Sequence, residues 1–571
     1  MAVILDGMMR KRALIVLGVV FLMAIAVAEH DLRATIFVVA IAALLTASLS
    51  LLTRRPRFSV YATGMLLAVL TAVSAAKMKY MGVALHAFDA FFYLRDASVA
   101  EFLLGSFLAP ILAVVAVLVG AVVVLTLVWR REAPSATIRR PTALALPILL
   151  VAPGLAFPRS PEDVLDSYYF RYHLTSSVFA SLPDVESLTR EPDLVRHLAS
   201  IDEPGAYTGA TRCSGAENGP DIVVALMESA VPPALYPDLR HAAELDRAFL
   251  GDDGRERGLR VETFGGGTWI TTTGLFAGLP TTEFGWMRPY LPYYLEGRIH
   301  HSVPRALERC GYDTAVVSPL AYRFVDEGPF LTSIGFDAFY DWKEIGAATK
   351  QERDRVYFDA VLARLRAHRA ATDRPLMIFV MTMATHSPFD RRFAPEEVLP
   401  DEPWGNDPQT DEYLRRLMLQ RRDLDDFAAA LAREPGRNGT ILADFGDHQP
   451  VVTRERARAA DPKALENLAS VAFRTYWRIT GIGRPLARAL PEVDVLDVPY
   501  LGVTILEAAG LPLDDVHTEL AALRDACAGR FADCRDRTRV DRHLKKFANA
   551  RMLDLGDGRP AADTRTAAAG Q

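Results

Sequence analysis

Cysteine is scarce in this chain of 571 residues, which contains Cys213, Cys310, Cys527 and Cys534 and no others. No C-x-x-C pair occurs among them, so a spacing common in structural zinc sites is absent. All four follow residue 212, and their number suits disulfide bonds in an oxidising compartment. Cys527 and Cys534 could close a short loop, but four cysteines permit three pairings and the sequence selects none.

Clustered positive charge is also lacking in the second part of the chain. Lys and Arg number 64 against 70 Asp and Glu, which gives a formal net charge of −6. Proteins that bind nucleic acid concentrate their basic residues in one segment or on one face. Since no basic block follows the apolar N-terminal region, we expect no nucleic-acid partner.

Long apolar runs, in contrast, fill the N-terminal part of the chain. Five of them approach the roughly 17–25 residues that a helix needs to cross a bilayer. They are residues 13–28, 34–52, 60–76, 107–129 and 141–157. The first run could be a cleaved signal peptide, but four more runs follow it, so we expect five membrane helices. The runs contain almost no ionisable residues, which argues against a transport pathway.

Basic residues flank these runs alternately. They cluster at 10–12, at 54–57 and at 130–140, whereas the two other connections are less basic. Lys and Arg beside membrane helices stay on the cytoplasmic side. The sequence therefore predicts a multi-pass protein of the cytoplasmic (inner) membrane with a cytoplasmic N-terminus. Everything after the fifth run would then be periplasmic or extracellular.

Four segments follow from this pattern. We expect a transmembrane domain of five helices over 1–158, an amphipathic linker over 159–216, an α/β domain over 217–515, and a C-terminal helical segment with a disordered tail over 516–571. In the third segment, short β-branched apolar runs alternate with stretches of helical character. This alternation is typical of a largely parallel sheet sandwiched by helices. Ligands of such sheets bind at the carboxyl ends of the strands.

Polar side chains follow three of the apolar runs at the expected strand ends. Glu228 ends DIVVALME, His386 follows PLMIFVMTMAT, and Asp447 with His448 follows TILADFG. Taken singly, Glu228 is explained as a helix cap or surface residue, and His386 as a partner for a loop carbonyl. Together, carboxylate and imidazole groups at one sheet edge predict a site for one divalent cation. Mn²⁺ is favoured, with Zn²⁺ or Mg²⁺ as alternatives.

A glycine-rich stretch, TFGGGTWITTTGLFAGLP at 263–280, is the remaining motif. It could be a flexible turn, or a phosphate-binding loop that presents a nucleophilic hydroxyl at the start of a helix. The metal site favours the second interpretation, because a coordinated hydroxyl has a lowered pKa and becomes a better nucleophile. Thr268 follows the glycines directly and is the expected nucleophile. Thr271, Thr272 and Thr273 are rivals that fall inside the expected helix.

These motifs resemble those of the alkaline phosphatase and sulfatase superfamily. The similarity comprises MES at 227–229, GGGTW at 265–269, IGFDAFYD at 334–341, THSPF at 385–389 and FGDH at 445–448. The closest patterns are those of membrane-anchored lipoteichoic acid synthases and phosphoglycerol transferases, with phosphoethanolamine transferases more distant. The resemblance implies an alkaline phosphatase-like fold for the α/β domain, which would be the sulfatase-like catalytic domain.

The resemblance also implies roles for individual residues. Glu228, Thr268, Asp447 and His448 would bind the metal, and Thr268 would become covalently phosphorylated. His386 would contact the transferred phosphoryl group. Trp269, beside the nucleophile, and Arg323, the nearest candidate for an anion contact, would bind substrate.

Some motifs of the superfamily are missing. The C/S-x-P-x-R sequence that sulfatases need for formylglycine is absent, which argues against sulfate-ester hydrolysis by that route. The Trp-Asn-Arg element that holds glycerol phosphate in lipoteichoic acid synthases is replaced by YRFVDEGPF, and Ser318 stands where those enzymes have a histidine. Asp326 and Glu327 in this segment either favour a cationic head group or are solvated loop residues.

We therefore expect a metal-dependent phosphotransferase. It would move a phospholipid head group, phosphoglycerol or phosphoethanolamine, through a phospho-threonine to a glycan or lipid acceptor outside the cytoplasm. A membrane-anchored phosphodiesterase with water as the acceptor is the alternative. A non-catalytic module that binds lipid or glycan is a third possibility, which the complete ligand set disfavours. The sequence leaves the head group, the acceptor and the oligomeric state open.

Overall fold

A computed structural model describes residues 23–29, 32–81, 84–94, 97–135, 174–182, 193–209, 213 and 219–555. The chain divides into two compact units, Met1–Leu188 and Thr189–Gln571. Most of the expected first apolar run and all of the fifth, 141–157, lie outside the described residues.

The described part of the N-terminal unit consists mainly of helices. Their bounds are α2 Leu32–Thr53, α3 Pro56–Met81, α4 Ala87–Leu94, α5 Ala97–Arg131 and α7 Ser176–Ala180. Among the described residues, three stretches are long and apolar enough to cross a membrane, namely Leu32–Thr53, Pro56–Met78 and Val114–Arg131. The expected total of five helices is not confirmed.

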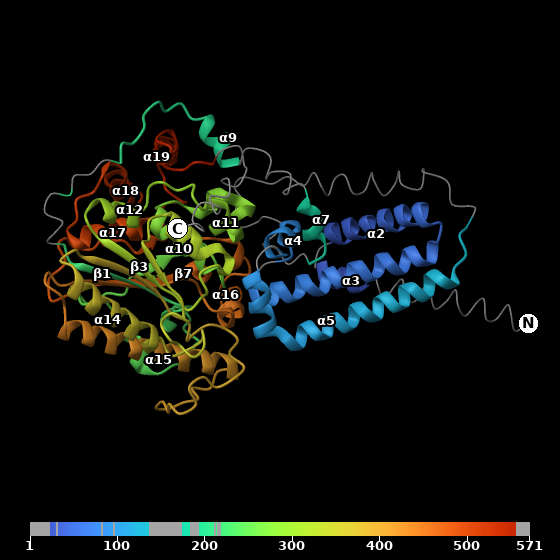
Figure 1. Cartoon of the computed structure of the whole chain (residues 1–571), viewed down its shortest axis with the longest axis horizontal. Helices are drawn as coiled ribbons and strands as arrows, with labels where there is room; N and C mark the ends of the chain where they lie inside the picture. Colours follow the sequence, from blue (N-terminus) through green and yellow to red (C-terminus); the bar gives the residue numbers. More distant parts are fainter. Residues whose placement is uncertain are drawn as a thin grey trace, which may run out of the picture. The chain divides into compact units, whose positions relative to one another are not determined.

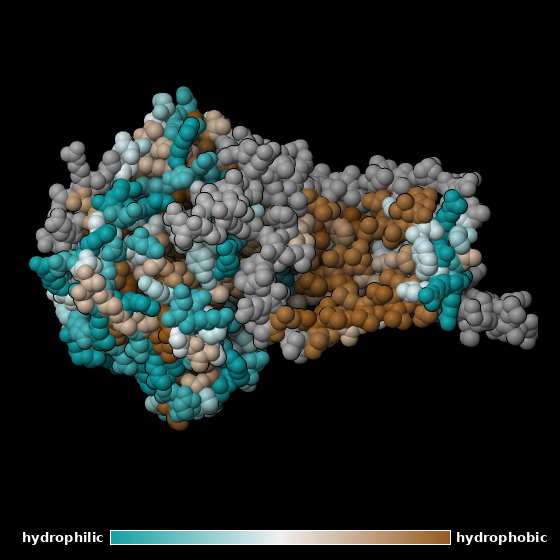
Figure 2. All heavy atoms as spheres, viewed as in Figure 1, coloured by the Kyte–Doolittle hydropathy of each residue, from teal (hydrophilic) through white to brown (hydrophobic). Residues whose placement is uncertain are grey.

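An uncovered apolar surface marks the three long helices. Large hydrophobic side chains such as Val117, Val119 and Val122 of α5 are more than half exposed. This surface is the brown region over α2, α3 and α5 in Figure 2. An exposed apolar area of this extent suits the hydrocarbon core of a bilayer, so the unit has the properties of a membrane anchor.

The second unit is built on a sheet whose eight described strands follow the order β4-β3-β5-β1-β6-β7-β2-β8. Their bounds are β1 Asp221–Met227, β2 Gly258–Arg260, β3 Asp313–Val317, β4 Ala338–Tyr340, β5 Leu376–Met381, β6 Thr440–Gly446, β7 Arg474–Ile482 and β8 Val495–Asp497. The five strands from β4 to β6 are parallel, and β7 pairs antiparallel with both β6 and β2. The expected largely parallel sheet is confirmed.

Helices cover both faces of this sheet (Figure 1). On one face lie α14, Asp354–Ala371, and α15, Pro408–Arg433; on the other lie α10, Thr268–Ala277, α12, Val303–Arg309, and α17, Leu501–Ala509. The other helices of the unit are α9 Asp193–Ala199, α11 Leu291–Leu295, α13 Glu327–Ser333, α16 Arg454–Ala460, α18 Asp515–Ala526 and α19 Arg537–Asn549. Because both faces are covered, every residue of β1 is buried, and its sequence is a continuous apolar run after Asp221.

One hydrophobic core includes both ends of the second unit. Leu194 and Leu198 of α9 belong to it, as do Leu520 of α18, Leu544 of α19 and Leu555 near the end of the described chain. The helices after residue 515 therefore pack with the sheet instead of forming a separate layer of their own.

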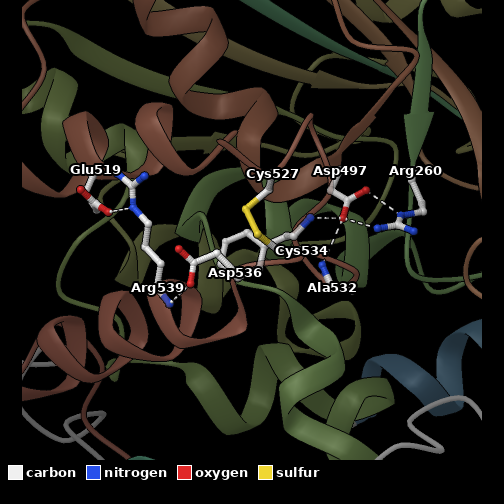
Figure 3. Close-up of a disulfide and its surroundings, with 9 residues drawn as sticks. Arg260, Asp497, Glu519, Cys527, Ala532, Cys534, Asp536 and Arg539 are labelled. Carbon is white, nitrogen blue, oxygen red and sulfur yellow. Dashed lines mark hydrogen bonds and ion pairs between the residues drawn. A yellow bond between two sulfur atoms is a disulfide. The ribbon is translucent and has the colours of Figure 1, made fainter. Parts of the chain in front are cut away.

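All four cysteines are paired, as Cys213–Cys310 and Cys527–Cys534. The second disulfide closes the turn between α18 and α19 (Figure 3). In this turn the backbone N–H of Phe531 donates to Asp497 Oδ2 at 2.6 Å. Asp497, at the end of β8, also accepts from Arg260 Nε and Nη2 of β2, both at 2.6 Å. The buried Arg260–Asp497 pair thus joins the sheet edge to the C-terminal turn.

Replacing Arg260 by Met should strongly destabilise the protein. The substitution leaves Asp497 buried without its cation, and breaking a buried pair in this way costs about 3–5 kcal/mol. Chemical denaturation of the purified protein would measure the change in the free energy of unfolding. Arg255→Met is the matched control, because Arg255 and its partner Glu492 are 60% and 79% exposed. If the two variants were equally stable, the buried pair would not be the link inferred here.

Candidate active site

The carboxyl ends of β1 and β6 bring three candidate metal ligands together. The two strands are parallel neighbours with Met227 opposite Gly446, so Glu228 and Asp447 leave the sheet side by side. Ligand atoms of Glu228, Asp447 and His448 all lie within 4.8 Å of one another, and all three side chains are buried. His448 Nε2 is 3.2 Å from Asp447 Oδ2 and 3.7 Å from Glu228 Oε1.

Thr268 completes this group from the first turn of α10. Its Oγ1 donates a hydrogen bond to Asp447 Oδ2 at 2.8 Å, and its side chain is only partly buried. The three preceding residues, Gly265, Gly266 and Gly267, have φ of 73°, 152° and 78°. These are left-handed conformations that side chains disfavour. The glycines therefore let the chain turn sharply and begin a helix with the Thr268 hydroxyl at the carboxylate.

The rival threonines are used elsewhere. Thr271 Oγ1 donates to the carbonyl of Asp447 at 2.6 Å, and Thr272 Oγ1 donates to the carbonyl of Thr268 at 3.1 Å. Thr273 is fully buried, and its hydroxyl has no partner among the described residues. Of these four threonines, Thr268 alone donates to a side-chain carboxylate.

Other predicted substrate contacts lie around this group without joining it. The His386 side chain, in the loop after β5, is exposed, and its Nδ1 lies 2.6 Å from the carbonyl of Ser387. Trp269 is 8% exposed, and its Nε1 has no partner among the described residues. Arg323 is exposed in the turn before α13. Their predicted contacts with substrate stay predictions.

Negative charge is crowded at this sheet edge. Burial, followed by the nearby Asp447 carboxylate, raises the pKa of Glu228 to about 8. A divalent cation would relieve this crowding, and two carboxylates, an imidazole and a hydroxyl are donors suited to Mn²⁺ or Zn²⁺. The residues present therefore fit a divalent metal.

Ser229 fixes the two carboxylates in place. Its Oγ donates to Glu228 Oε1 at 2.7 Å, and its backbone N–H donates to Asp447 Oδ1 at 2.8 Å. Its φ is 49°, an unfavourable value for a residue other than glycine. Tyr413 of α15 holds this turn by donating to the carbonyl of Ser229 at 2.9 Å. Ser229 belongs to the MES motif, but no feature of the sequence marks Tyr413.

Gln420, also on α15, connects the β1 and β5 loops. Its Nε2 donates to the carbonyl of Glu228 at 3.2 Å and to Thr385 Oγ1 at 2.8 Å. Its Oε1 has no donor among the described residues, and neither has Oδ2 of its hydrogen-bonding neighbour Asp354. A proton on Asp354 would satisfy both oxygens. Burial raises the pKa of Asp354 to about 7, which is consistent with that proton.

Glu327 is a further residue whose position the sequence does not reveal. It begins α13 and is 2% exposed, and Asp326 before it is 6% exposed. The sequence left open that Asp326 and Glu327 are solvated loop residues, and their burial shows that they are not. Burial, followed by the Asp447 carboxylate, raises the pKa of Glu327 to about 8. Glu327 lies in the segment after β3, and β3 is parallel to β5, as β5 is to β1, so this segment leaves the sheet at the same edge.

Asp354→Asn should change how stability depends on pH. The pKa of Asp354 is raised from 3.8 to about 7 in the folded protein. The folded state therefore binds more protons than the unfolded state between roughly pH 4 and 7, and this carboxyl makes the unfolding free energy fall as pH rises through that window. Asn cannot lose a proton and still donates to Gln420 Oε1, so the variant should gain stability relative to wild type on going from pH 5 to pH 8.

Denaturant unfolding at both pH values measures this difference. Asp373→Asn is the control, because Asp373 is 94% exposed. If the free energy of unfolding changed equally with pH in wild type and Asp354→Asn, Asp354 would not be protonated in the folded state.

The second unit matches a known family in sequence. Residues 220–470 match the family model described as Sulfatase. An uncharacterized protein of Haemophilus influenzae is 22% identical over 318 residues, which cover 52% of this chain and 55% of that protein. The chain thus spans about half the length of this curated relative.

Solved structures show a more distant likeness. The Streptococcus pyogenes phosphoglycerol transferase GacH, in complex with sn-glycerol-1-phosphate, is 14% identical with a TM-score of 0.45, over 64% of this chain and 92% of that chain. The lipooligosaccharide phosphoethanolamine transferase A (EptA) from Neisseria meningitidis is 11% identical with a TM-score of 0.45, over 87% and 96%. Similarities of this size carry no argument about activity.

The family match includes every strand and loop that contributes to the site. Glu228, Thr268, His386, Asp447 and His448 all lie within residues 220–470. The superfamily resemblance predicted from the motifs is therefore confirmed to the extent that residues 220–470 match the Sulfatase family model.

Proposed function

We propose that this protein is a membrane-anchored, metal-dependent transferase that moves a phospholipid head group through a phosphorylated Thr268. The hydrogen bond from Thr268 Oγ1 to Asp447 Oδ2, 2.8 Å long, carries the proposal. It places a partly exposed hydroxyl, at the N-terminus of a helix, against the buried group of Glu228, Asp447 and His448. This arrangement suits nucleophilic attack on an anionic phosphorus centre.

One divalent cation would be held by Glu228, Thr268, Asp447 and His448, and Mn²⁺ is proposed ahead of Zn²⁺ and Mg²⁺. When bound, it would lower the pKa of the Thr268 hydroxyl and stabilise negative charge on phosphoryl oxygens. The protein itself holds the ligands together, because Ser229 donates hydrogen bonds to both carboxylates. It also shields Glu228, Asp447 and His448 from water, since all three are buried.

The reaction would proceed in two displacements. Thr268 Oγ1 loses its proton and bonds to phosphorus, and the bond between phosphorus and the diacylglycerol oxygen breaks. Diacylglycerol leaves after taking up a proton, and the head group remains on Thr268 as a phosphodiester. A hydroxyl of a glycan or lipid acceptor then loses its proton and bonds to phosphorus. Thr268 Oγ1 leaves and regains a proton.

His386, Trp269 and Arg323 are the proposed substrate contacts. His386 would contact the transferred phosphoryl group, for which its exposed position in the loop after β5 is suitable. Trp269 follows the nucleophile, and its Nε1 is a buried donor without a partner among the described residues, which a substrate atom would satisfy. Arg323 would bind an anionic part of the substrate.

The membrane anchor suits a lipid donor, because donor and enzyme then share one surface and the effective concentration is high. We propose that the domain containing residues 220–470 lies on the outer side of the cytoplasmic membrane. The pairing of all four cysteines supports this side, since disulfides persist in oxidising compartments.

Thr268→Ala should abolish diacylglycerol release from phospholipid, with a loss of at least about a hundredfold, since removing a nucleophile removes the covalent route. Thr268→Ser should keep part of the activity because it retains a hydroxyl. Release would be measured with purified full-length protein, Mn²⁺ and labelled phosphatidylethanolamine or phosphatidylglycerol. Thr273→Val, a nearly isosteric change at a hydroxyl without a partner, is the control. Release that survives in Thr268→Ala would remove Thr268 from the mechanism.

Adding Mn²⁺ to metal-stripped protein should raise its unfolding temperature. Binding to the folded state stabilises it by about 2.7 kcal/mol when the metal is at a hundred times its Kd. His448→Ala should lose this shift. His517→Ala tests the other group with metal-ligand spacing, His301, Asp514 and His517. If only His517→Ala lost the shift, the proposed metal site would be wrong.

A further inference from the structure

Glu327 is buried without the partners that a carboxylate needs. Its side chain is 2% exposed, and neither Oε1 nor Oε2 accepts a hydrogen bond from any described residue. Nor does it form an ion pair with a basic side chain in the described part of the chain. A buried polar group in this state is costly, and a buried charge more so. Such a group calls for a partner that arrives from outside the chain.

The backbone before Glu327 is strained. Val325 and Asp326 have φ of 49° and 57°, which is rare for residues other than glycine and rarest for a β-branched one. The turn is closed by the N–H of Gly328, which donates to the carbonyl of Tyr322 at 3.0 Å. A Cβ at Gly328 would lie 2.2 Å from that oxygen, so the turn admits only glycine there. Backbone strain of this kind, fixed by the surrounding turn, is typical of functional sites, where it sets the orientation of a side chain.

Glu327 belongs to the segment that follows β3. Because β3, β5, β1 and β6 are parallel, this segment leaves the sheet at the edge where Glu228 and Asp447 lie. Burial, and after it the Asp447 carboxylate, raises the pKa of Glu327, which agrees with this placement. The edge therefore holds three carboxylates, Glu228, Asp447 and Glu327. A single divalent cation balances two of them. An ammonium group beside Glu327 would favour the ionised form of this carboxyl and would supply the hydrogen-bond donors that both of its oxygens lack.

We propose that Glu327 receives the primary ammonium of a zwitterionic head group, so that the donor is an amine-bearing phospholipid of the phosphoethanolamine class. A primary ammonium has three N–H donors and can satisfy both carboxylate oxygens. A quaternary ammonium brings the charge but no donor, and a glycerol head group brings hydroxyls but no charge. Glu327 is thus a specificity-determining residue. This inference rests on the proposed transferase function.

The test compares three lipids and one diester without a lipid. Purified full-length protein with Mn²⁺ is incubated with micelles of phosphatidylethanolamine, phosphatidylglycerol or phosphatidylcholine, and diacylglycerol release is measured. Bis(p-nitrophenyl) phosphate, which has no head-group cation, reports on the nucleophile and metal alone. Wild type should use phosphatidylethanolamine best, by roughly ten- to a hundredfold, the range expected for hydrogen bonds to a charged group.

Glu327→Gln is the decisive variant, because it keeps the shape and removes the charge. It should lose most of its activity on phosphatidylethanolamine, with cleavage of the aryl diester and of phosphatidylglycerol unchanged. Glu344→Gln, at an exposed carboxylate 17 residues further along, should behave as wild type. Unfolding temperatures of all variants establish that they are folded, and Glu327→Asp, which keeps the charge, should retain the preference in weakened form.

Three results would overturn the inference while the proposed function stands. They are a wild-type preference for phosphatidylglycerol, an unchanged preference in Glu327→Gln, and an equal loss on aryl diester and lipid in that variant. Absence of cleavage of every diester by the metal-loaded wild type would instead overturn the proposed function, and the inference with it.

Discussion

Repulsion between carboxylates is the constraint around which this site is organised. The parallel register of β1 and β6 makes Glu228 and Asp447 leave the sheet as neighbours, and burial weakens the screening of their charges. The surrounding groups respond to that charge. Ser229 donates twice, Thr268 once, and His448 lies against both carboxylates. A cation site and an oriented hydroxyl therefore arise from one feature of strand pairing.

Unfavourable backbone conformations gather at the same edge. Three consecutive glycines precede Thr268, Ser229 follows the first carboxylate with a positive φ, and Val325 and Asp326 precede Glu327 with positive φ values. At Ser229, Val325 and Asp326 the positive φ costs free energy that ordinary turns do not, whereas the glycines adopt theirs without that cost. The sheet and the helical layers on its two faces supply the stability that holds these turns. The packed part of the domain thus stabilises the fold, and the strained turns position the residues of the site.

The strand ends could be predicted from sequence because of two local signals. Continuous apolar runs mark buried parallel strands, and polar residues directly after them must meet at one edge, so the sequence predicts that Glu228 and Asp447 lie together. Residues on distant helices that hold these strand ends in place have no comparable sequence pattern. Tyr413 and Gln420 lie on a helix with ordinary amphipathic character, and their contacts with the β1 turn depend on how α15 packs. The burial of Glu327 likewise follows from a turn whose φ values no propensity favours.

The single core shared by both ends of the second unit also bears on how the protein is made. Residues near 194 and near 555 pack in the same cluster, and the N–H of His300 donates to the carbonyl of Met552 at 2.8 Å. Chains are synthesised from the N-terminus, and domains generally fold as units. This unit cannot close its core until α19, the last helix among the described residues, has emerged. If it crosses a membrane, almost four hundred residues must therefore pass through before the fold is complete, which leaves apolar strands in need of protection along the way.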